Sequence, residues 1–184
     1  MEELTKQEYR LKYKDFRKEL STNALNSLEA KINSQLIEMV KSNVHVYLPI
    51  LKNIEVNIWP FINHSFNKNT IVGTSIYNKS VTKHVEISKS TIYSKGEFNI
   101  PTPTNAEETN LLDFNYIIVP LMAYDKTGNR IGYGKGIYDS ILKKCKDDCI
   151  KIGVSHFNAE QKVPFETHDI KLDYCINSIG TLKF

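Results

Sequence analysis

Residues 116–139 read YIIVPLMAYDKTGNRIGYGKGIYD, and this stretch decides the fold. It opens with a near-continuous apolar run, Tyr116–Pro120, which is typical of a parallel strand that is covered on both faces. A loop rich in glycine follows over residues 125–136, and the apolar spacing beyond it predicts a helix over residues 137–146. A buried strand, a loop and a helix in this order indicate an α/β domain.

Three more helices are expected on the amino-terminal side of this unit. Apolar residues at helical spacing predict two longer helices, over residues 5–21 and 23–40, and Asn23 is a suitable cap for the second. A short helix is expected over residues 58–66, because Pro60 would fall in its first turn, where proline is tolerated.

Short runs rich in β-branched and aromatic residues supply the remaining strands. They lie at residues 44–48, 70–77, 81–87, 151–154 and 178–182. A polar turn is expected over residues 78–80, and an extended loop over residues 98–110, which contain two prolines. Because strands alternate with helices, we predict a single layered α/β domain over residues 1–184. It would have a mostly parallel central sheet flanked by helices, and two helices at its amino terminus.

Composition excludes several classes of protein. The formal net charge is +3, from 24 Lys and Arg against 21 Asp and Glu, and the basic residues are scattered. A nucleic-acid-binding protein that uses the basic first helix is therefore a minor alternative, and no aromatic stacking platform supports it. The amino-terminal residues form no apolar signal segment, and no apolar run is long enough for a bilayer. A cytoplasmic protein without a membrane partner is expected.

The cysteines do not form a structural framework. No C-x-x-C pair occurs, and the odd number argues against a set of disulfides or a zinc site. We expect reduced thiols in a reducing compartment for all three, which are Cys145, Cys149 and Cys175.

The glycine-rich loop has the composition of a phosphate-binding site. Glycines let the backbone approach a ligand and direct N–H groups toward it, and a following helix amino terminus adds partial positive charge. The loop fits neither the P-loop nor the dinucleotide or kinase fingerprints, because its glycine spacing differs and no Ser or Thr follows the lysine. Glycines alone would equally suit a flexible turn. The charged residues among them favour a site: Arg130, Lys135 and Asp139, interleaved with Gly132, Gly134 and Gly136.

The segment VPLMAYDKTGNRIGYGKGIYD, residues 119–139, closely resembles the long signature of the 5-formyltetrahydrofolate cyclo-ligases. That signature combines an aromatic-Asp pair with Gly-x-Arg-hydrophobic-Gly-x-Gly-x-Gly and a closing Tyr-Tyr-Asp. Here Ile137 replaces the first Tyr of the pair, which removes no charge. The resemblance is weakest over residues 63–96. It continues in four further segments, which are KQEYR (6–10), RKELS (17–21), NIPTP (99–103) and VPFETHDIKLD (163–173).

The resemblance implies a site for ATP and Mg²⁺. Without it, Lys6 and Arg10 would be assigned to a solvated basic face, Asp139 to a helix cap and Asp169 to a loop. In the family, the positions that match Asp139 and Asp169 help to hold Mg²⁺, which takes one or two carboxylates plus phosphate oxygens. Contacts to ATP are implied for the following residues: Lys6, Arg10, Arg130, Gly132, Tyr133, Gly134, Lys135, Gly136 and Tyr138.

The implied reaction is the ATP-dependent cyclisation of 5-formyltetrahydrofolate to 5,10-methenyltetrahydrofolate, with release of ADP and phosphate. Arg130, Lys135 and Glu55 are its expected catalytic residues. The substrate would contact Leu48, Glu55, Tyr133 and Ile137. The match around Glu55 is loose, and Asn53 is a rival for its position.

A homologue that binds ATP but acts on another substrate is therefore the main alternative. We expect a monomer with a small-molecule substrate. The charge of +3 is compatible with a polyglutamate tail on the folate but does not argue for one.

Overall fold

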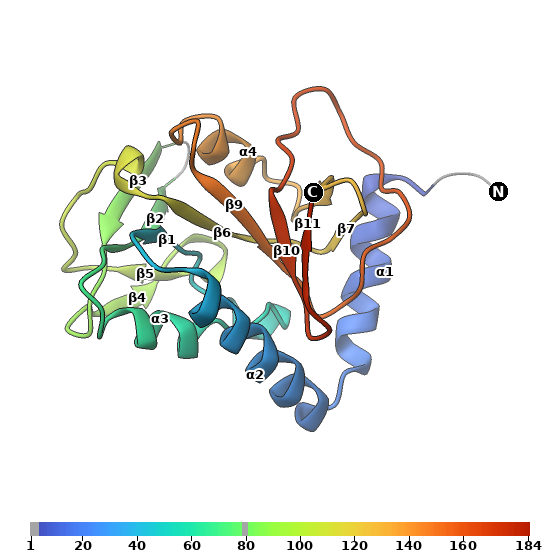
Figure 1. Ribbon diagram of the computed structural model, residues 1–184, viewed down its shortest axis with the longest axis horizontal. Coiled ribbons are helices and arrows are strands. Elements are labelled where there is room, and N and C mark those ends of the chain that lie inside the picture. The colour runs from blue at the N-terminus through green and yellow to red at the C-terminus, as the bar shows by residue number, and fades with distance from the viewer. Residues whose placement is uncertain (1–3, 79–80) are drawn as a thin grey trace.

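A computed structural model describes residues 4–78 and 81–184 of the chain, and its main feature is a seven-stranded sheet (Figure 1). The strand order is β11 (Thr181–Lys183), β10 (Tyr174–Ile176), β9 (Ile150–Val154), β6 (Tyr116–Pro120), β1 (Val44–His45), β2 (Val72–Asn78) and β3 (Val81–Glu86). The five inner strands run parallel, and the two edge strands, β11 and β3, pair antiparallel. The predicted mostly parallel sheet is confirmed.

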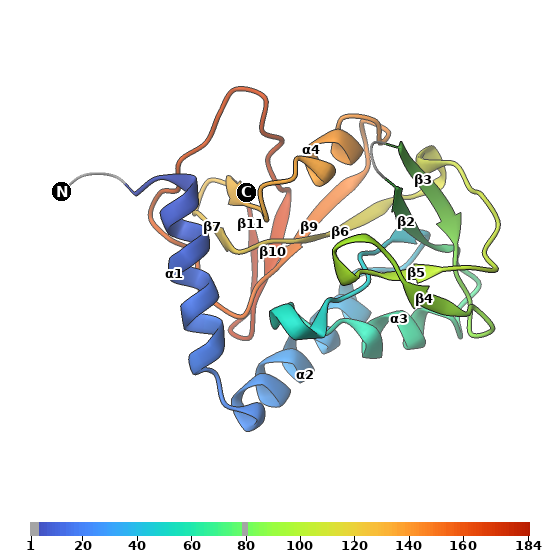
Figure 2. The same ribbon diagram turned by 180° about the vertical axis from the view of Figure 1, so that it is seen from behind.

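Strand β6 lies at the centre of the sheet, and both of its faces are buried. Ile118 packs on the face that is covered by α2 (Thr22–Met39) and α3 (Trp59–Ser65). Ile117 and Val119 pack on the opposite face, which is covered by α4 (Ile137–Leu142). Figures 1 and 2 show α2 and α3 together on one side of the sheet and α4 on the other. The apolar run that opened the sequence analysis is thus explained by burial on both faces.

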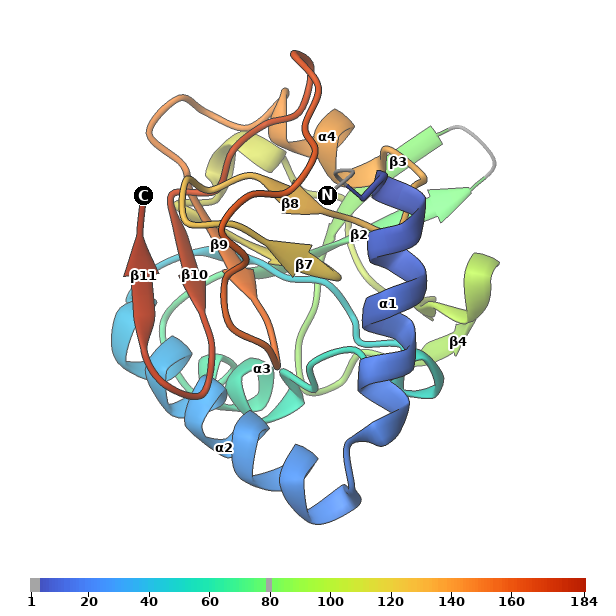
Figure 3. The same ribbon diagram turned by 90° about the vertical axis from the view of Figure 1, so that its right-hand side faces the viewer.

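The first helix, α1 (Lys6–Glu19), stands at one end of the sheet. Tyr9 and Tyr13 pack against the short hairpin of β7 (Ala123–Tyr124) and β8 (Arg130–Ile131). Figure 3 shows α1 beside this hairpin. Its amino terminus is fixed by a capping box, in which Thr5 and Glu8 satisfy each other's backbone N–H groups. This packing holds α1 beside the glycine-rich loop that follows β8.

Several predicted boundaries were wrong. The cap of α2 is Ser21, whose hydroxyl accepts from the Ala24 N–H, and Asn23 lies inside the helix. Helix α4 ends at Leu142, four residues before the predicted end. The predicted strand over 44–48 is reduced to two residues, and its remainder is a buried connection.

Short strands also appear where none were predicted. β10 was missed, and β11 covers residues 181–183 instead of 178–182. The predicted extended loop over 98–110 contains β5 (Pro101–Pro103), which pairs with β4 (Tyr93–Lys95). That pair forms a separate two-stranded sheet, where prolines are tolerated because no ladder continues beyond them. The polar turn predicted over 78–80 falls partly on residues outside the described ranges.

One glycine marks a close approach within the sheet. A Cβ atom on Gly73 of β2 would lie 2.2 Å from Cζ of Phe114, whose side chain is fully buried. Only glycine leaves room for this ring beneath the sheet.

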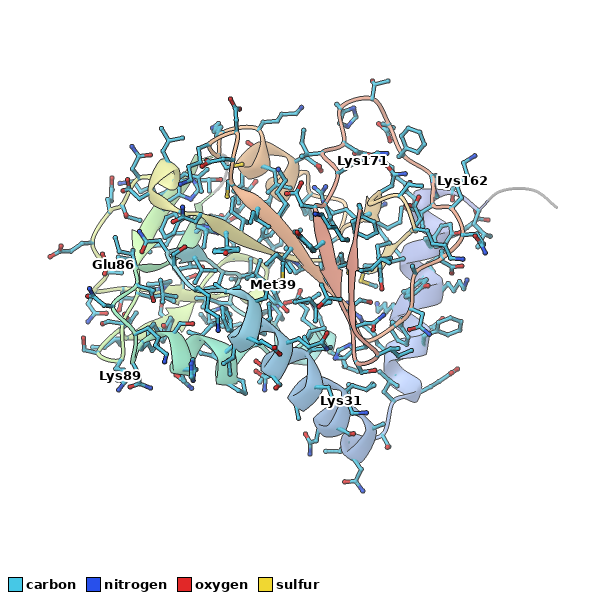
Figure 4. The ribbon with its side chains drawn as sticks, viewed as in Figure 1. Lys31, Met39, Glu86, Lys89, Lys162 and Lys171 are labelled. Carbon is cyan, nitrogen blue, oxygen red and sulfur yellow. The ribbon has the colours of Figure 1, made fainter. Side chains whose placement is uncertain are left out.

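Basic side chains are dispersed over the molecule. Lys31, Lys89 and Lys162 lie at three separate edges of the view in Figure 4. Within residues 4–78 and 81–184, no helix combines the length and the apolar character needed to cross a membrane.

Candidate active site

A cavity of about 550 Å³ opens between α1, the glycine-rich loop, α4 and the carboxyl ends of β1, β2 and β6. Ligands of open α/β sheets bind at this end of the parallel strands. All the site residues predicted from the sequence line this central cavity, including both Glu55 and its rival Asn53. The structure therefore brings together residues from positions 6 to 169, while their individual roles stay predictions.

Lys6 lies at one end of the cavity in a cluster of acids. Its Nζ atom is 2.6 Å from Oδ2 of Asp169 and 2.9 Å from Oε1 of Glu166. Burial alone would lower the pKa of Lys6, but its hydrogen bonds to both acids outweigh this effect, and the net pKa is raised. Lys6 is therefore charged at neutral pH and lines the cavity instead of forming part of a solvated basic face.

Arg130 and Asp139 form a second ion pair in the same cavity. Nη2 of Arg130 lies 2.5 Å from Oδ1 of Asp139, and Nη1 donates to the Ile170 carbonyl. The Arg130 side chain is only 4% exposed. The alternative that Asp139 caps its helix is wrong, because the cap is Gly136 and no side chain caps α4.

The glycine-rich loop adopts a backbone that requires glycine at two of its positions. Gly134 has φ +87° and Gly136 has φ +66°, a region that other residues rarely adopt. Arg10 of α1 contacts this loop, because its Nε donates a hydrogen bond of 2.8 Å to the Gly132 carbonyl. A Cβ atom on Gly134 would lie 3.1 Å from Cζ of Arg10. The loop glycines thus allow the guanidinium group to lie directly against the backbone.

Glu55 is the buried acid of the cavity, at 6% exposure. Its Oε2 accepts a hydrogen bond of 2.7 Å from the Ile50 N–H, across the tight turn that ends at Ile54. Burial raises the pKa of Glu55, whereas the Ile50 N–H, the charge of Arg17 and the Tyr133 hydroxyl oppose this effect. Burial is the largest of these influences, so the net pKa of Glu55 is raised.

Arg17 is the main residue that sequence reasoning missed. It is 3% exposed, and its guanidinium group donates to the Tyr133 hydroxyl at 2.8 Å and to the carbonyls of Leu121 (2.8 Å) and Asn53 (3.2 Å). Tyr133 in turn interacts with Glu55. A signal existed, because Arg17 lies four residues after Tyr13 on the buried face of α1, where a cation needs partners.

The middle of the chain supplies a wall of the cavity that was not predicted. Ser75 and Tyr77 reach it from β2, and Phe98 and Ile100 reach it from the segment around β5. Phe98 has φ +56°, an unusual value for an aromatic residue, and Nζ of Lys135 lies 5.1 Å from its ring centre. On this side of the cavity, the glycine-rich loop therefore contacts the 96–100 segment through Lys135 and Phe98.

The acids of the cavity suit a metal ion that is shared with a phosphate group. Within the described part of the chain, no group of three or more His, Cys, Asp or Glu side chains could form a metal site by itself. Asp139 and Asp169 both line the cavity beside cations that suit phosphate. Mg²⁺ takes one or two carboxylates together with phosphate oxygens and waters, so this donor set fits Mg²⁺ bound with a nucleotide.

Comparison with known proteins identifies relatives over most of the chain. The chain is 26% identical to the 5-formyltetrahydrofolate cyclo-ligase of Mycoplasma genitalium, over 87% of this chain and 90% of that protein. It is 29% identical to the enzyme of the same name from Mycoplasma pneumoniae, over 86% and 89% of the two chains.

Solved structures give the same result. The NMR structure of Aquifex aeolicus 5,10-methenyltetrahydrofolate synthetase has a TM-score of 0.85 at 27% identity, and the match covers 98% of this chain and 93% of that one. A 5,10-methenyltetrahydrofolate synthetase from Mycoplasma pneumoniae shares the fold, with a TM-score of 0.71 at 20% identity, over 95% of this chain and 99% of that one. The model of the 5-formyltetrahydrofolate cyclo-ligase family matches residues 2–178, and the chain therefore belongs to that family.

Proposed function

We propose that the central cavity binds ATP and 5-formyltetrahydrofolate and closes the folate into 5,10-methenyltetrahydrofolate, with release of ADP and phosphate. ATP is a substrate of this reaction. The observation that carries the proposal is the convergence of several cations and a buried acid, Glu55, on a single cavity. The cations suit a triphosphate, and the buried acid suits a polar heterocycle.

The chemistry requires that a formyl oxygen become a leaving group. The 5-formyl oxygen attacks the γ-phosphorus and displaces ADP. N10 then adds to the formyl carbon and loses its proton, and phosphate departs with the former formyl oxygen. Catalysis of such phosphoryl transfer depends on positioning and on neutralising negative charge.

The cations of the cavity have roles in the first step. We assign the phosphates to Lys6, Arg10, Arg130 and Lys135, with backbone N–H groups of the glycine-rich loop as additional donors. In the structure Arg130 is paired with Asp139 and donates to the Ile170 carbonyl, which keeps its guanidinium group at the cavity. Tyr133, Tyr138 and Ile137 lie between the loop and α4, where nucleotide and folate would meet.

Mg²⁺, when bound with ATP, would neutralise phosphate charge beside Asp139 and Asp169. Each of these carboxylates has a protein cation as its partner in the structure. Holding Mg²⁺ would therefore involve an exchange of partners, in which Lys6 and Arg130 turn toward phosphate oxygens.

Glu55 and Leu48 are assigned to the folate. Both residues are buried and line the cavity, whereas Asn53 lines it but is exposed to solvent. Glu55 is suited to accept hydrogen bonds from the reduced pterin or from N10. Asn53 is the weaker candidate, because its backbone carbonyl accepts a hydrogen bond from Arg17 and the residue is exposed to solvent.

Compartment and assembly follow from simpler observations. All three cysteines are free thiols, which suits a reducing compartment, and we place the enzyme in the cytoplasm as a monomer. Its folate substrate can carry a polyglutamate tail, whose negative charge the overall positive charge would tolerate.

The test is to mix the protein with 5-formyltetrahydrofolate, ATP and Mg²⁺ and to follow the near-ultraviolet absorbance of the methenyl product. Product should form only with ATP, and Arg130→Ala and Asp139→Ala should abolish it. Lys6→Ala should reduce product formation, because Lys6 is assigned to the phosphates. Lys14→Ala is its matched control, because Lys14 lies on the same helix but does not line the cavity. A folded protein that binds ATP without forming product would point to another substrate. Full turnover in Glu55→Gln would refute the role in catalysis that we assign to Glu55.

A further inference from the structure

Three polar side chains on adjacent strands form a hydrogen-bonded chain beside the central cavity. Nε2 of His45 on β1 lies 2.9 Å from Oγ of Ser75 on β2, and that oxygen lies 3.0 Å from Nδ1 of His84 on β3. These strands are neighbours in the sheet, as Figures 1 and 2 show. None of the three residues was singled out by the motif.

The hydrogen bonds among His45, Ser75 and His84 connect two cavities. Ser75 lines the central cavity, whereas His84 lines a separate open groove together with Thr82, Glu108 and Lys144. Ile141 of α4 lines the central cavity, and Lys144, just beyond the end of that helix, lines the groove. The hydrogen bond between Ser75 and His84 is thus a polar connection from the active site to the outside.

Burial determines which atoms donate in the hydrogen bonds among His45, Ser75 and His84. His45 is fully buried, and its ring lies edge-on to that of Phe114. Burial lowers the pKa of His45 to about 3, and His84 lowers it by a smaller amount, while a hydrogen bond to the Thr74 backbone acts in the opposite direction. The neutral ring carries one proton. Among the described residues, Nδ1 of His45 has no hydrogen-bond partner. An unpaired buried N–H is rarer than an unpaired acceptor, which places the proton on Nε2, facing Ser75.

With His45 as the donor, the Ser75 hydroxyl directs its own proton to Nδ1 of His84. Burial lowers the pKa of His84, and the positive charge of Lys144 lowers it further. Among the residues that the structure describes, the other charged group in the groove is Glu108, which is paired with Lys83. At neutral pH His84 is therefore uncharged and can accept a proton.

We propose that Ser75 and His84 carry the N10 proton out of the active site, with His45 fixing the orientation of the Ser75 hydroxyl. This inference rests on the proposed function, in which N10 loses a proton as it bonds to the formyl carbon. The N10–H bond breaks, Ser75 gains that proton, and its original proton moves to Nδ1 of His84. His84 becomes a cation until water in the groove takes a proton and restores the neutral ring. No oxidant or further reactant is needed.

The test compares Ser75→Ala, Ser75→Thr, His84→Ala and His84→Asn in the methenyl assay. Positioned proton transfer contributes about 10²–10⁴-fold to rates; because water can substitute in part, we expect kcat to fall about ten-fold in Ser75→Ala and both His84 variants. KM for both substrates should change less than about two-fold, since binding groups are intact. Ser75→Thr keeps the hydroxyl and should retain activity. Thr82→Ala, in the same groove, is the matched control.

Two readouts separate proton transfer from a structural role. Added imidazole should restore part of the activity of His84→Ala, where the groove admits it, but none in Ser75→Ala, where the chain is broken. The acidic limb of the kcat–pH profile, produced by protonation of His84, should be lost in His84→Asn. Melting temperatures of the variants report whether the fold survives.

The outcomes are distinguishable. Absence of product from the unmodified protein refutes the proposed function. Normal kcat in folded Ser75→Ala and His84→Ala overturns the proton route while leaving the function intact. A fall in kcat without imidazole rescue and with an unchanged pH profile assigns these residues to packing and also overturns it.

Discussion

Replacement of Arg17 by methionine tests how the buried part of the site is held together. Methionine keeps most of the apolar stem but removes the charge and three hydrogen bonds, leaving the acceptors on Leu121, Asn53 and Tyr133 without a donor. Removing one partner of a buried charged network costs about 3–5 kcal/mol. For a chain of this length each kcal/mol lowers the melting temperature by about 2–4 °C, so a drop of roughly 6–20 °C is expected.

The loss should also depend on pH, because Arg17 is one of the groups that oppose the raised pKa of Glu55. Without Arg17 the folded-state pKa of Glu55 rises further, while its unfolded value stays near 4.5. The folded state then holds a proton that the unfolded state releases, so stability falls as pH rises from 4.5 through the new folded pKa. Each tenfold increase in the proton affinity of Glu55 in the folded state adds about 1.4 kcal/mol to the loss at pH 8 relative to pH 5.

Urea unfolding at pH 5 and pH 8 measures both effects. Arg17→Lys is the control, because it keeps the charge but cannot reach all three acceptors, and it should lose stability without the additional pH dependence. Equal losses in Arg17→Met and Arg17→Lys at both pH values would refute the view that the charge of Arg17 controls Glu55.

Three further predictions concern the loop and the sheet. Gly134→Ala should raise the KM for ATP and lower stability by about 1 kcal/mol, since its φ is +87° and its Cβ would press on Arg10; initial rates and thermal melting check this. Gly73→Ala should lower the melting temperature more strongly, because overpacking against Phe114 costs about 1–3 kcal/mol or more. Lys6→Met should weaken ATP binding about ten-fold, a typical effect of losing one charge-assisted phosphate contact, which calorimetric titration would detect.

The sequence was sufficient to predict the central architecture, because burial on both faces leaves a clear pattern. The apolar run of β6 and the helical spacing of α2 are local signals with one interpretation. Strand β10 was missed because only three residues, Tyr174–Ile176, are paired, and their neighbours are polar. Strand β5 was missed because Pro101 and Pro103 argue against a strand, although an isolated hairpin accepts them.

The same distinction applies to the site. Residues in the glycine-rich loop could be found because function requires several unusual residue types close together in the sequence. Ser75 and Phe98 could not, since their position at the cavity depends on strand pairing and on a backbone turn. The helical spacing of Arg17 from Tyr13 indicates burial, but its contacts with Tyr133 and with the carbonyls of Leu121 and Asn53 depend on how α1 packs.

The ion pairs Lys6–Asp169 and Arg130–Asp139 have a consequence for selectivity. Two of the four cations that we assign to phosphate, Lys6 and Arg130, already have an internal counterion, so these two add little net positive field to the site. A bare anion such as sulfate that binds to either of them would have to displace a carboxylate and leave it uncompensated. A magnesium nucleotide offers both signs at once, and all four protein charges can change partners together. The two ion pairs would thus favour the metal complex over simple anions at Lys6 and Arg130, and this preference would already be present in the folded chain.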